Sequence, residues 1–376
     1  MDADAPRGLL RYFQDMNDPR HHNVHHRLDD IVAIAILAVI CGAENWSDVA
    51  YFGRCKQKWL KTFLALPNGI PSHDTFGRVF ARLDPIEFER CFVNWTAAVA
   101  KLPHGRLVAI DGKTLRRSFD RAADKAAIHM INAWCRENRL VLGQLAEEAK
   151  ENEIVAIPKL LKLLDLNGAV VSIDAIGCQK QIARQIVKQG GDYLLQVKAN
   201  QGQMYQQLKA TLDEAIGLKF ADMEHDFHRT VYGDHGRIET RRLWCTRDID
   251  WLPGLEQWEG LRSVAVVQRC RQINGKTSTE RAYYISSLPG DDAEQMLDLA
   301  RGHWSIENQL HWSLDVSFGE DASRIRTGHA AENFSRLRRF ALGLLAREKS
   351  CKLGKKAKSK GCSWDHDYLL KVLTQS

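Results

Sequence analysis

The hydrophobic positions divide the chain into a helical part and a mixed part. The longest apolar run covers residues 31–41, too short to cross a bilayer, which requires about 20 residues, so we expect a buried helix there. Up to residue 104 the apolar positions keep helical spacing, and beyond it they form short β-branched runs separated by amphipathic segments. We therefore expect a helical N-terminal domain over residues 1–104 and an α/β domain over residues 105–347.

One helix of the N-terminal domain carries basic residues away from its apolar face. Its apolar positions, at i, i+3, i+4 and i+7, are Phe76, Val79, Phe80 and Leu83. Ser72 is placed to cap its N-terminus, and Arg78 and Arg82 lie off the apolar stripe. After the turn at residues 69–71, this helix either reads DNA in a helix-turn-helix-like arrangement or belongs to a bundle with ordinary surface arginines.

Beyond residue 104 the expected order is three strands, a helix, a strand, a helix and a strand. The first β-branched run ends at Asp111 and the fourth strand ends at Asp174. This order matches the first part of a ribonuclease-H-like fold, in which the first and fourth strands are parallel neighbours. We therefore expect the two aspartates to lie side by side.

A β-rich insertion is expected over about residues 200–290. The chain between Asp174 and Glu307 is about twice as long as the chain between Asp111 and Asp174, so the α/β core is interrupted. The strand-like runs in this interval are residues 228–232, 239–245, 263–270 and 281–286. Between the last two, Asn274-Gly275 favours a tight hairpin turn.

The segment 301–315 places a glutamate on the polar stripe of an amphipathic helix. The polar positions at i, i+4, i+8 and i+12 are His303, Glu307, His311 and Asp315. Because Glu307 follows the two aspartates in order, we expect the three acids to converge. Taken alone, each aspartate also fits a strand-end turn, and Glu307 fits a helix-surface acid. A zinc site from His303, Glu307 and His311 is a further alternative, although no cysteine is nearby.

The order and extent of several sequence motifs identify a family. The motifs are Asn68-Gly69-Ile70-Pro71-Ser72-His73-Asp74-Thr75-Phe76, Ala109-Ile110-Asp111-Gly112-Lys113, Ser172-Ile173-Asp174-Ala175, and His303-Trp304-Ser305-Ile306-Glu307-Asn308 through Phe318-Gly319-Glu320-Asp321. With them the chain resembles the DDE transposases of bacterial insertion sequences, most closely the ISAs1 family with its H-repeat-associated proteins. The resemblance covers nearly the whole chain, and IS4-like transposases carry a similar β insertion.

The resemblance implies metal-dependent cleavage of DNA and strand transfer. Asp111 is then expected to bridge two Mg²⁺ ions, with Asp174 holding one and Glu307 the other, and Mn²⁺ is expected to substitute. The expected partners are double-stranded DNA, as the terminal inverted repeats of the element and as target DNA, and a second copy of the chain. Dimerisation is inferred because two DNA ends must be paired. No membrane and no small-molecule substrate are expected.

Several residues are candidates for contact with DNA. They are Lys113, Arg116, Arg117, Arg301, His303, Asn308 and His311, together with Arg78 and Arg82. For the arginines and lysine beside Asp111, solvated hairpin charges are the alternative. Trp304 and Trp312 are interpreted as core residues, with stacking on an extruded base as the alternative.

One departure from the broader IS4-like group concerns the helix that carries the glutamate. That group has a tyrosine, an arginine and a lysine at set offsets from its glutamate, and here these offsets hold Ala300, His303 and Leu314. The chain follows the ISAs1 motif instead. The resemblance therefore does not indicate how the second DNA strand is processed.

Composition permits a nucleic-acid partner and favours a reducing compartment. The formal net charge is +6 and the isoelectric point about 8.8, a mild basic excess. The nine cysteines contain no C-x-x-C pair, as in a reduced cytosolic protein. Together with this composition, the resemblance implies a bacterial cytoplasmic protein, associated with the nucleoid through DNA. Lysines crowd into residues 348–376, which we expect to be a basic tail, either solvated or phosphate-binding.

Two other functions remain open on the sequence. A nuclease or resolvase of ribonuclease-H fold would cut without joining, and strand-transfer products distinguish it from a transposase. A domesticated DNA-binding relative without catalysis would most simply have lost an acid, yet all three are present.

Overall fold

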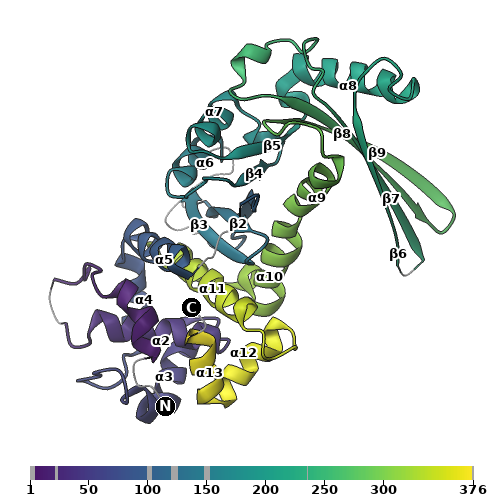
Figure 1. The fold of residues 1–376 in the computed structure, drawn as a ribbon. Helices are drawn as coiled ribbons and strands as arrows, with labels where there is room; N and C mark the ends of the chain where they lie inside the picture. The colour runs from purple at the N-terminus through teal and green to yellow at the C-terminus, as the bar shows by residue number, and fades with distance from the viewer. Residues whose placement is uncertain are drawn as a thin grey trace. The chain divides into compact units, whose positions relative to one another are not determined.

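The computed structural model describes residues 5–21, 24–99, 104–119, 126–147, 153–234 and 236–374 (Figure 1). The chain forms two compact units. We call the first the helical unit; it comprises Met1–Leu102, Gly112–Asn152 and Glu307–Ser376. The second, the sheet unit, comprises Pro103–Asp111 and Glu153–Ile306. Strand β1 (Leu107–Thr114) begins in the sheet unit and ends in the helical unit.

The helical unit contains the helices expected near the N-terminus and four more from the C-terminal part of the chain. They are α1 (Ala5–Leu10), α2 (Leu28–Ile40), α3 (Trp46–Leu60), α4 (His73–Arg82), α5 (Pro85–Val99), α10 (Trp312–Phe318), α11 (Ala330–Arg347), α12 (Lys355–Trp364) and α13 (His366–Thr374). Helix α2 is buried over almost its whole length, as its apolar run predicts. Among the described residues, no helix has the length and apolar character needed to cross a membrane.

The start of α4 confirms the cap expected from the sequence. The Ser72 hydroxyl accepts a hydrogen bond from the backbone N–H of Thr75 at 3.3 Å. The side chains of Phe76, Val79 and Phe80 are buried, so the predicted apolar stripe faces the interior.

Helix α11 is buried on all sides and carries arginines paired with buried acids. Arg336 Nε lies 2.9 Å from a carboxylate oxygen of Glu89 on α5. Arg339 Nη1 lies 2.6 Å from a carboxylate oxygen of Glu320, and neither of these two side chains is exposed. Removing one partner of such a pair leaves an uncompensated buried charge, which costs about 3–5 kcal/mol. These pairs join α11 to segments distant in sequence.

The C-terminal segment differs from the basic tail that we expected over residues 348–376. It folds into α12 and α13, and two of its lysines are taken up inside the helical unit. Lys358 Nζ donates to the Leu345 carbonyl at 3.2 Å and lies 3.5 Å from a carboxylate oxygen of Glu348. Lys355 Nζ donates to the Ser313 hydroxyl at 2.9 Å, and burial lowers the pKa of Lys355 to about 8. These lysines thus have structural partners.

Two of the expected strands form a hairpin within the helical unit. Strands β2 (His129–Cys135) and β3 (Leu140–Glu147) pair in antiparallel register. Both strands are largely buried, in agreement with the apolar runs that predicted them.

The sheet unit combines parallel and antiparallel pairing. Its strands follow the order β1-β4-β5-β9-β8-β7-β6. The strands after β1 are β4 (Val170–Ile173), β5 (Asp192–Val197), β6 (Asp226–Asp234), β7 (Arg237–Thr246), β8 (Ser263–Ile273) and β9 (Lys276–Ser286). Strands β1, β4 and β5 are parallel, and β9 then pairs with β5 in the antiparallel direction. The helices of this unit are α6 (Glu153–Leu161), α7 (Lys180–Lys188), α8 (Gly202–Gly217) and α9 (Ala293–His303).

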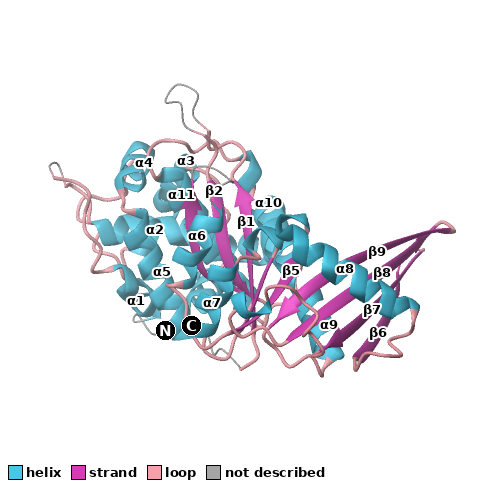
Figure 2. Ribbon diagram, turned by 90° about the horizontal axis from the view of Figure 1, so that it is seen from above, coloured by secondary structure: helices cyan, strands magenta, loops and turns pink. Residues whose placement is uncertain are grey.

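The β-rich segment contains four strands where the sequence predicts four. Figure 2 shows β6–β9 side by side, continuing the sheet from β5. The β8–β9 turn has positive φ at both Asn274 and Gly275, 49° and 77°, the backbone that a two-residue type I′ hairpin requires. Helix α9 packs on this sheet through Met296 and Leu297, which join a buried cluster with Leu243 of β7. The segment therefore extends the central sheet instead of forming a separate layer.

Candidate active site

Asp111 and Asp174 lie at matching positions of two paired strands. In the parallel pair β1–β4, Ile110 is the register partner of Ile173, and each aspartate is the next residue. Strand β4 ends directly before Asp174, whereas β1 continues beyond Asp111 to Thr114, so the expectation that the first strand ends at Asp111 is wrong. Adjacent strands are about 4.8 Å apart, so matching positions on them are neighbours. The structure therefore brings together the two aspartates that the sequence singled out.

Asp174 occupies an environment that penalises its negative charge. Burial raises the pKa of Asp174, and the neighbouring Glu153 raises it further. The backbone N–H of Ile176, which donates to the Asp174 carboxylate at 3.1 Å, and the charge of Lys198 act in the opposite direction. A carboxylate disfavoured by burial and by a second acid is stabilised when a cation binds beside it. Glu153, the first residue of α6, has no sequence signal beyond an acid in the first turn of a helix.

Lys198 is a further charged residue beside Asp174 that the sequence analysis missed. It is exposed and directly follows β5, the parallel neighbour of β4. The segment after it is fixed to the loop that follows Asp174. Asn200 Nδ2 donates to the Ala175 carbonyl at 2.6 Å, and Gln201 Nε2 donates to the Cys178 carbonyl at 2.8 Å. The sequence signal that could have identified Lys198 is a basic residue directly after a strand expected to be parallel.

His303 contacts β4 from the end of α9. Its Nδ1 lies 2.9 Å from the hydroxyl oxygen of Ser172, two residues before Asp174. Burial lowers the pKa of His303 to about 4, an effect to which Lys198 adds and which the Ser172 backbone opposes. The imidazole is therefore neutral near pH 7. Its role as a DNA contact stays a prediction.

Glu307 lies in the helical unit, and its helix differs from the expected one. Helix α9 ends at His303, and a π-helix, Ile306–His311, separates it from α10. A π-helical turn contains more residues than an α-helical turn, so the i, i+4, i+8 spacing does not keep His303, Glu307 and His311 on one stripe. The expectation of a single α-helical stripe is wrong. Glu307 is exposed, and π-helical turns are frequent at functional sites.

The zinc alternative gains no support from the structure. Within the described ranges, no group of three or more His, Cys, Asp or Glu side chains is arranged to hold a metal ion, so the structure gathers neither the zinc alternative nor Asp111, Asp174 and Glu307 into one group.

Lys113, two residues after Asp111, is held by two carboxylates of the helical unit. Its Nζ lies 2.9 Å from a carboxylate oxygen of Asp315 and 3.1 Å from one of Asp321, and its side chain is 10% exposed. Arg116 Nε also lies 3.3 Å from Asp321, but the Arg116 side chain is mostly exposed. Lys113 therefore positions Asp315 and Asp321, and contact with phosphate by Lys113 stays a prediction.

The remaining predicted DNA contacts occupy varied environments. Arg117, Asn308, Arg78 and Arg82 are exposed, as a DNA contact requires. His311 is partly buried, and burial, with Arg339 and Lys113, lowers its pKa to about 3, so it is neutral. Arg301 is held by Tyr232, as described below.

The two tryptophans of the glutamate segment are exposed. Trp304 is 43% exposed and Trp312 is 60% exposed. The interpretation of both as core residues is therefore wrong.

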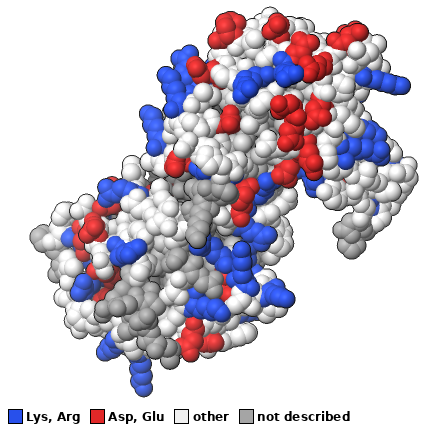
Figure 3. All heavy atoms as spheres, viewed as in Figure 1, with Lys and Arg blue, Asp and Glu red and all other residues white. Residues whose placement is uncertain are grey.

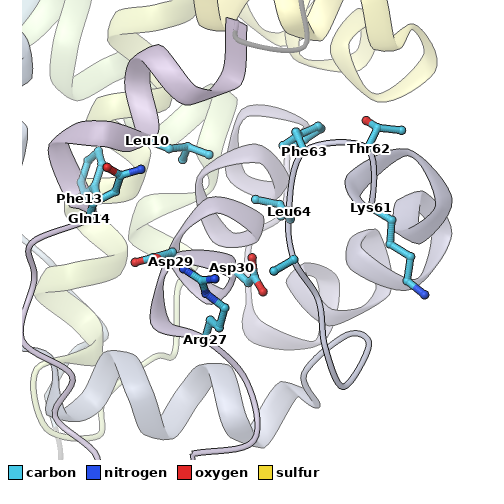
Figure 4. Close-up of a pocket in the computed structure, with 11 residues that line it drawn as sticks. Leu10, Phe13, Gln14, Arg27, Asp29, Asp30, Lys61, Thr62, Phe63 and Leu64 are labelled. Atoms are coloured by element: carbon cyan, nitrogen blue, oxygen red, sulfur yellow. Dashed lines mark hydrogen bonds and ion pairs between the residues drawn. The ribbon is translucent and has the colours of Figure 1, made fainter.

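A pocket of the helical unit contains none of the predicted site residues. Figure 4 shows the residues that line it, which come from the end of α1 and the residues after it, from the start of α2 and from the segment that follows α3. Asp30 accepts a hydrogen bond from the backbone N–H of Leu66 at 2.9 Å, and burial raises the pKa of Asp30. This hydrogen bond ties α2 to the segment after α3, which gives the acid a structural role.

Comparison with known proteins finds transposase families and transposase relatives. Residues 103–344 match the family described as Transposase DDE domain, and residues 10–96 match the family described as DDE_Tnp_1-associated. The chain is 40% identical over 359 residues to the H repeat-associated putative transposase YhhI of Escherichia coli (strain K12), covering 94% of both proteins. It is 41% identical over 370 residues to the putative transposase YncI of Escherichia coli O157:H7, covering 97% of this chain and 94% of that protein. A stretch of 59 residues, 16% of this chain, is 46% identical to the inactive transposase YbfQ of Escherichia coli (strain K12) and covers 70% of it.

Proposed function

Because the chain belongs to the Transposase DDE domain family, as its sequence motifs indicated, we propose that it cuts DNA at the terminal inverted repeats of an insertion sequence and joins the freed ends to target DNA. The family supports a DNA-cleaving insertion-sequence transposase with a ribonuclease-H-like core. The repeats, the joining step and the pairing of two ends by a dimer are parts of the proposal.

One observation carries the proposal: the register of β1 and β4, which puts Asp111 and Asp174 at matching positions of neighbouring strands. Two aspartates held side by side repel each other when both are ionised, and the fold adds Glu153 near Asp174. Such an arrangement is unfavourable for stability alone. It is favourable where the acids hold a cation against a phosphate.

Asp111, Asp174 and Glu307 are the ligand type for the divalent metal ions that the family generally uses, although the structure does not gather the three side chains into one group. Mg²⁺ prefers carboxylate oxygens and is usually held by a few protein acids together with substrate phosphate and water. We propose that Asp111, Asp174 and Glu307 hold two such ions, with Mn²⁺ able to substitute. The bound ions would supply activation of the attacking water or 3′-hydroxyl and neutralisation of charge on the leaving oxygen.

The chain's own groups position the acids and the DNA. The Ser172–His303 hydrogen bond fixes the end of β4 and thereby the backbone that carries Asp174. The ammonium group of Lys198 would contact a DNA phosphate beside Asp174; its electrostatic effect on Asp174 and the hydrogen bonds between the segment after it and the loop after Asp174 support this. In the helical unit, the Lys113 ion pairs hold Asp315 and Asp321.

The test is cleavage and joining of labelled DNA that carries the repeats flanking the coding region. Purified wild type, Asp174→Asn and Glu307→Gln are compared in Mg²⁺, in Mn²⁺ and in EDTA. We expect wild type to cut and join only with metal and both variants to bind DNA without cutting. Cutting without joining would favour a nuclease or resolvase, and metal-independent cutting by the variants would contradict the proposed site.

A further inference from the structure

Strands β7 and β8 carry arginines on the face of the sheet that α9 covers. Side chains alternate along a strand, so Arg237 and Arg241 share a face with Leu243, which belongs to the buried cluster beneath α9. Arg269 of β8 is the register partner of Arg241. Arg271 is the register partner of Glu239, and α9 contributes Arg301. We call these five residues the arginine cluster: Arg237, Arg241, Arg269, Arg271 and Arg301.

The acids of this region compensate only part of the positive charge. The Glu239 side chain is 4% exposed and forms ion pairs with Arg237, with Arg241 at 2.7 Å and with Arg271 at 3.7 Å. Arg269 is paired with Glu280 of β9. Among the described residues, these pairs therefore join four arginines to two glutamates and leave a positive excess.

The positive excess is unfavourable within the isolated protein. Arg241 and Arg269 lie directly opposite each other on neighbouring strands, and like charges in that position destabilise a sheet. Burial lowers the pKa of Arg241, and the charges of Arg301, Arg269 and Arg237 lower it further against the opposing effect of Glu239. A bound polyanion would relieve this repulsion.

The cluster is also fixed in place and accessible. The Arg301 guanidinium lies 4.6 Å from the ring centre of Tyr232 and donates to its hydroxyl at 3.0 Å. Arg237 is about half exposed and Arg269 and Arg271 about one third exposed, so their donors reach the surface. In Figure 3, Lys and Arg side chains lie over the strands β6–β9. A guanidinium whose side chain is already ordered loses less entropy when it binds phosphate.

We propose that the arginine cluster binds the sugar–phosphate backbone of duplex DNA at a place separate from the carboxylate site. From Arg237 to Arg241 the strand extends about 13 Å, and duplex DNA carries one charge per about 1.7 Å of its axis, so the cluster faces several phosphates. Guanidinium groups bind phosphate without reading bases, so the contact is independent of sequence. This inference rests on the proposed function, since it gives DNA as the substrate.

The same sheet supplies a matched control. Arg229 of β6 and Arg242 of β7 are register partners on the opposite face, where the alternation of side chains places them. The double variant Arg241→Ala/Arg269→Ala and the control Arg229→Ala/Arg242→Ala remove the same charge from directly paired positions of one sheet. Arg301→Ala, on α9, is a second cluster variant that leaves the strands intact.

The experiment measures the Kd of the full-length protein for a duplex without repeat sequences over a series of salt concentrations. For Arg241→Ala/Arg269→Ala we expect Kd to rise about tenfold. The negative slope of the log of the binding constant against log salt should become shallower by up to about 1.8. The control is expected to stay within about twofold of wild type, and Arg301→Ala to weaken binding in the same direction as the cluster variant. Equal losses of DNA affinity in both double variants, or no loss of affinity in the cluster variants, would overturn the inference. Wild type that binds no DNA at all would instead refute the proposed function.

Discussion

Asp111 and Asp174 occupy equivalent positions on neighbouring parallel strands, because the residue before each, Ile110 and Ile173, is the other's register partner. The relationship is a property of backbone pairing and does not depend on side-chain rotamers. It joins two acids that are far apart in the sequence, and Asp174 is additionally half-buried near Glu153.

Replacement of either aspartate by asparagine is expected to lower the cleavage rate without lowering the stability of the fold. Loss of a residue that supports a metal ligand costs about 10–100-fold, so loss of a ligand itself should lower the cleavage rate by more than about 100-fold. Asp174→Asn removes a half-buried charge beside Glu153 and should leave Tm unchanged or raise it. Cleavage rates and thermal unfolding of both variants test this, and a fall in Tm that accounts for the lost activity would contradict it.

Lys198→Ala is expected to lower the cleavage rate by about tenfold through loss of a phosphate contact, with Lys198→Arg retaining most of the activity. Because the Lys198 charge lies near Asp174, its removal should also strengthen metal binding. Mn²⁺ titration and cleavage kinetics measure the two effects. Lys188→Ala, an exposed lysine on α7, is the control, and a weaker metal affinity in Lys198→Ala would argue against this role.

His303 should make stability depend on pH. Its pKa is lowered to about 4, below the ordinary value of 6.5, so the unfolded state binds the proton more readily. The contribution of the neutral His303 to the free energy of unfolding is complete above pH 6.5. It is lost as the pH falls toward 4, and the total loss is about 3 kcal/mol. The difference in Tm between wild type and His303→Gln should therefore shrink over this interval, and a constant difference would contradict the buried neutral histidine.

Arg339→Met is expected to destabilise the helical unit strongly. It leaves the Glu320 carboxylate buried without its guanidinium, at a cost of about 3–5 kcal/mol, whereas Arg339→Met/Glu320→Gln should recover much of this loss. The exposed pair Arg247–Glu224 provides the comparison, because Arg247→Ala should cost less than about 1 kcal/mol. Denaturant unfolding measures the loss of stability in each variant. Equal losses of stability in Arg339→Met and Arg247→Ala would show that burial of the Arg339 pair is unimportant.

The features predicted from sequence are those set by local chemistry or strand order. The Ser72 cap and the Asn274-Gly275 turn depend on a few adjacent residues, and both form as expected. The pairing of Asp111 with Asp174 follows from the order of strands and helices, which leaves few arrangements of the first and fourth strands.

The features that were missed depend on long-range contacts. Arg336 and Arg339 have the sequence character of surface residues, and nothing local indicates their buried partners Glu89 and Glu320. The π-helix at Ile306–His311 has the same polar and apolar alternation as an α-helix, so the periodicity did not reveal it. Tryptophans are usually buried, which explains the wrong interpretation of Trp304 and Trp312.

The metal site proposed at the paired aspartates is tested most directly by Mn²⁺ binding to the full-length protein, measured by calorimetry with and without DNA. We expect wild type to bind Mn²⁺, Asp111→Asn and Asp174→Asn each to weaken binding by more than about tenfold, and the exposed Asp291→Asn to bind like wild type. Equal Mn²⁺ affinity in wild type and in both aspartate variants would contradict the account.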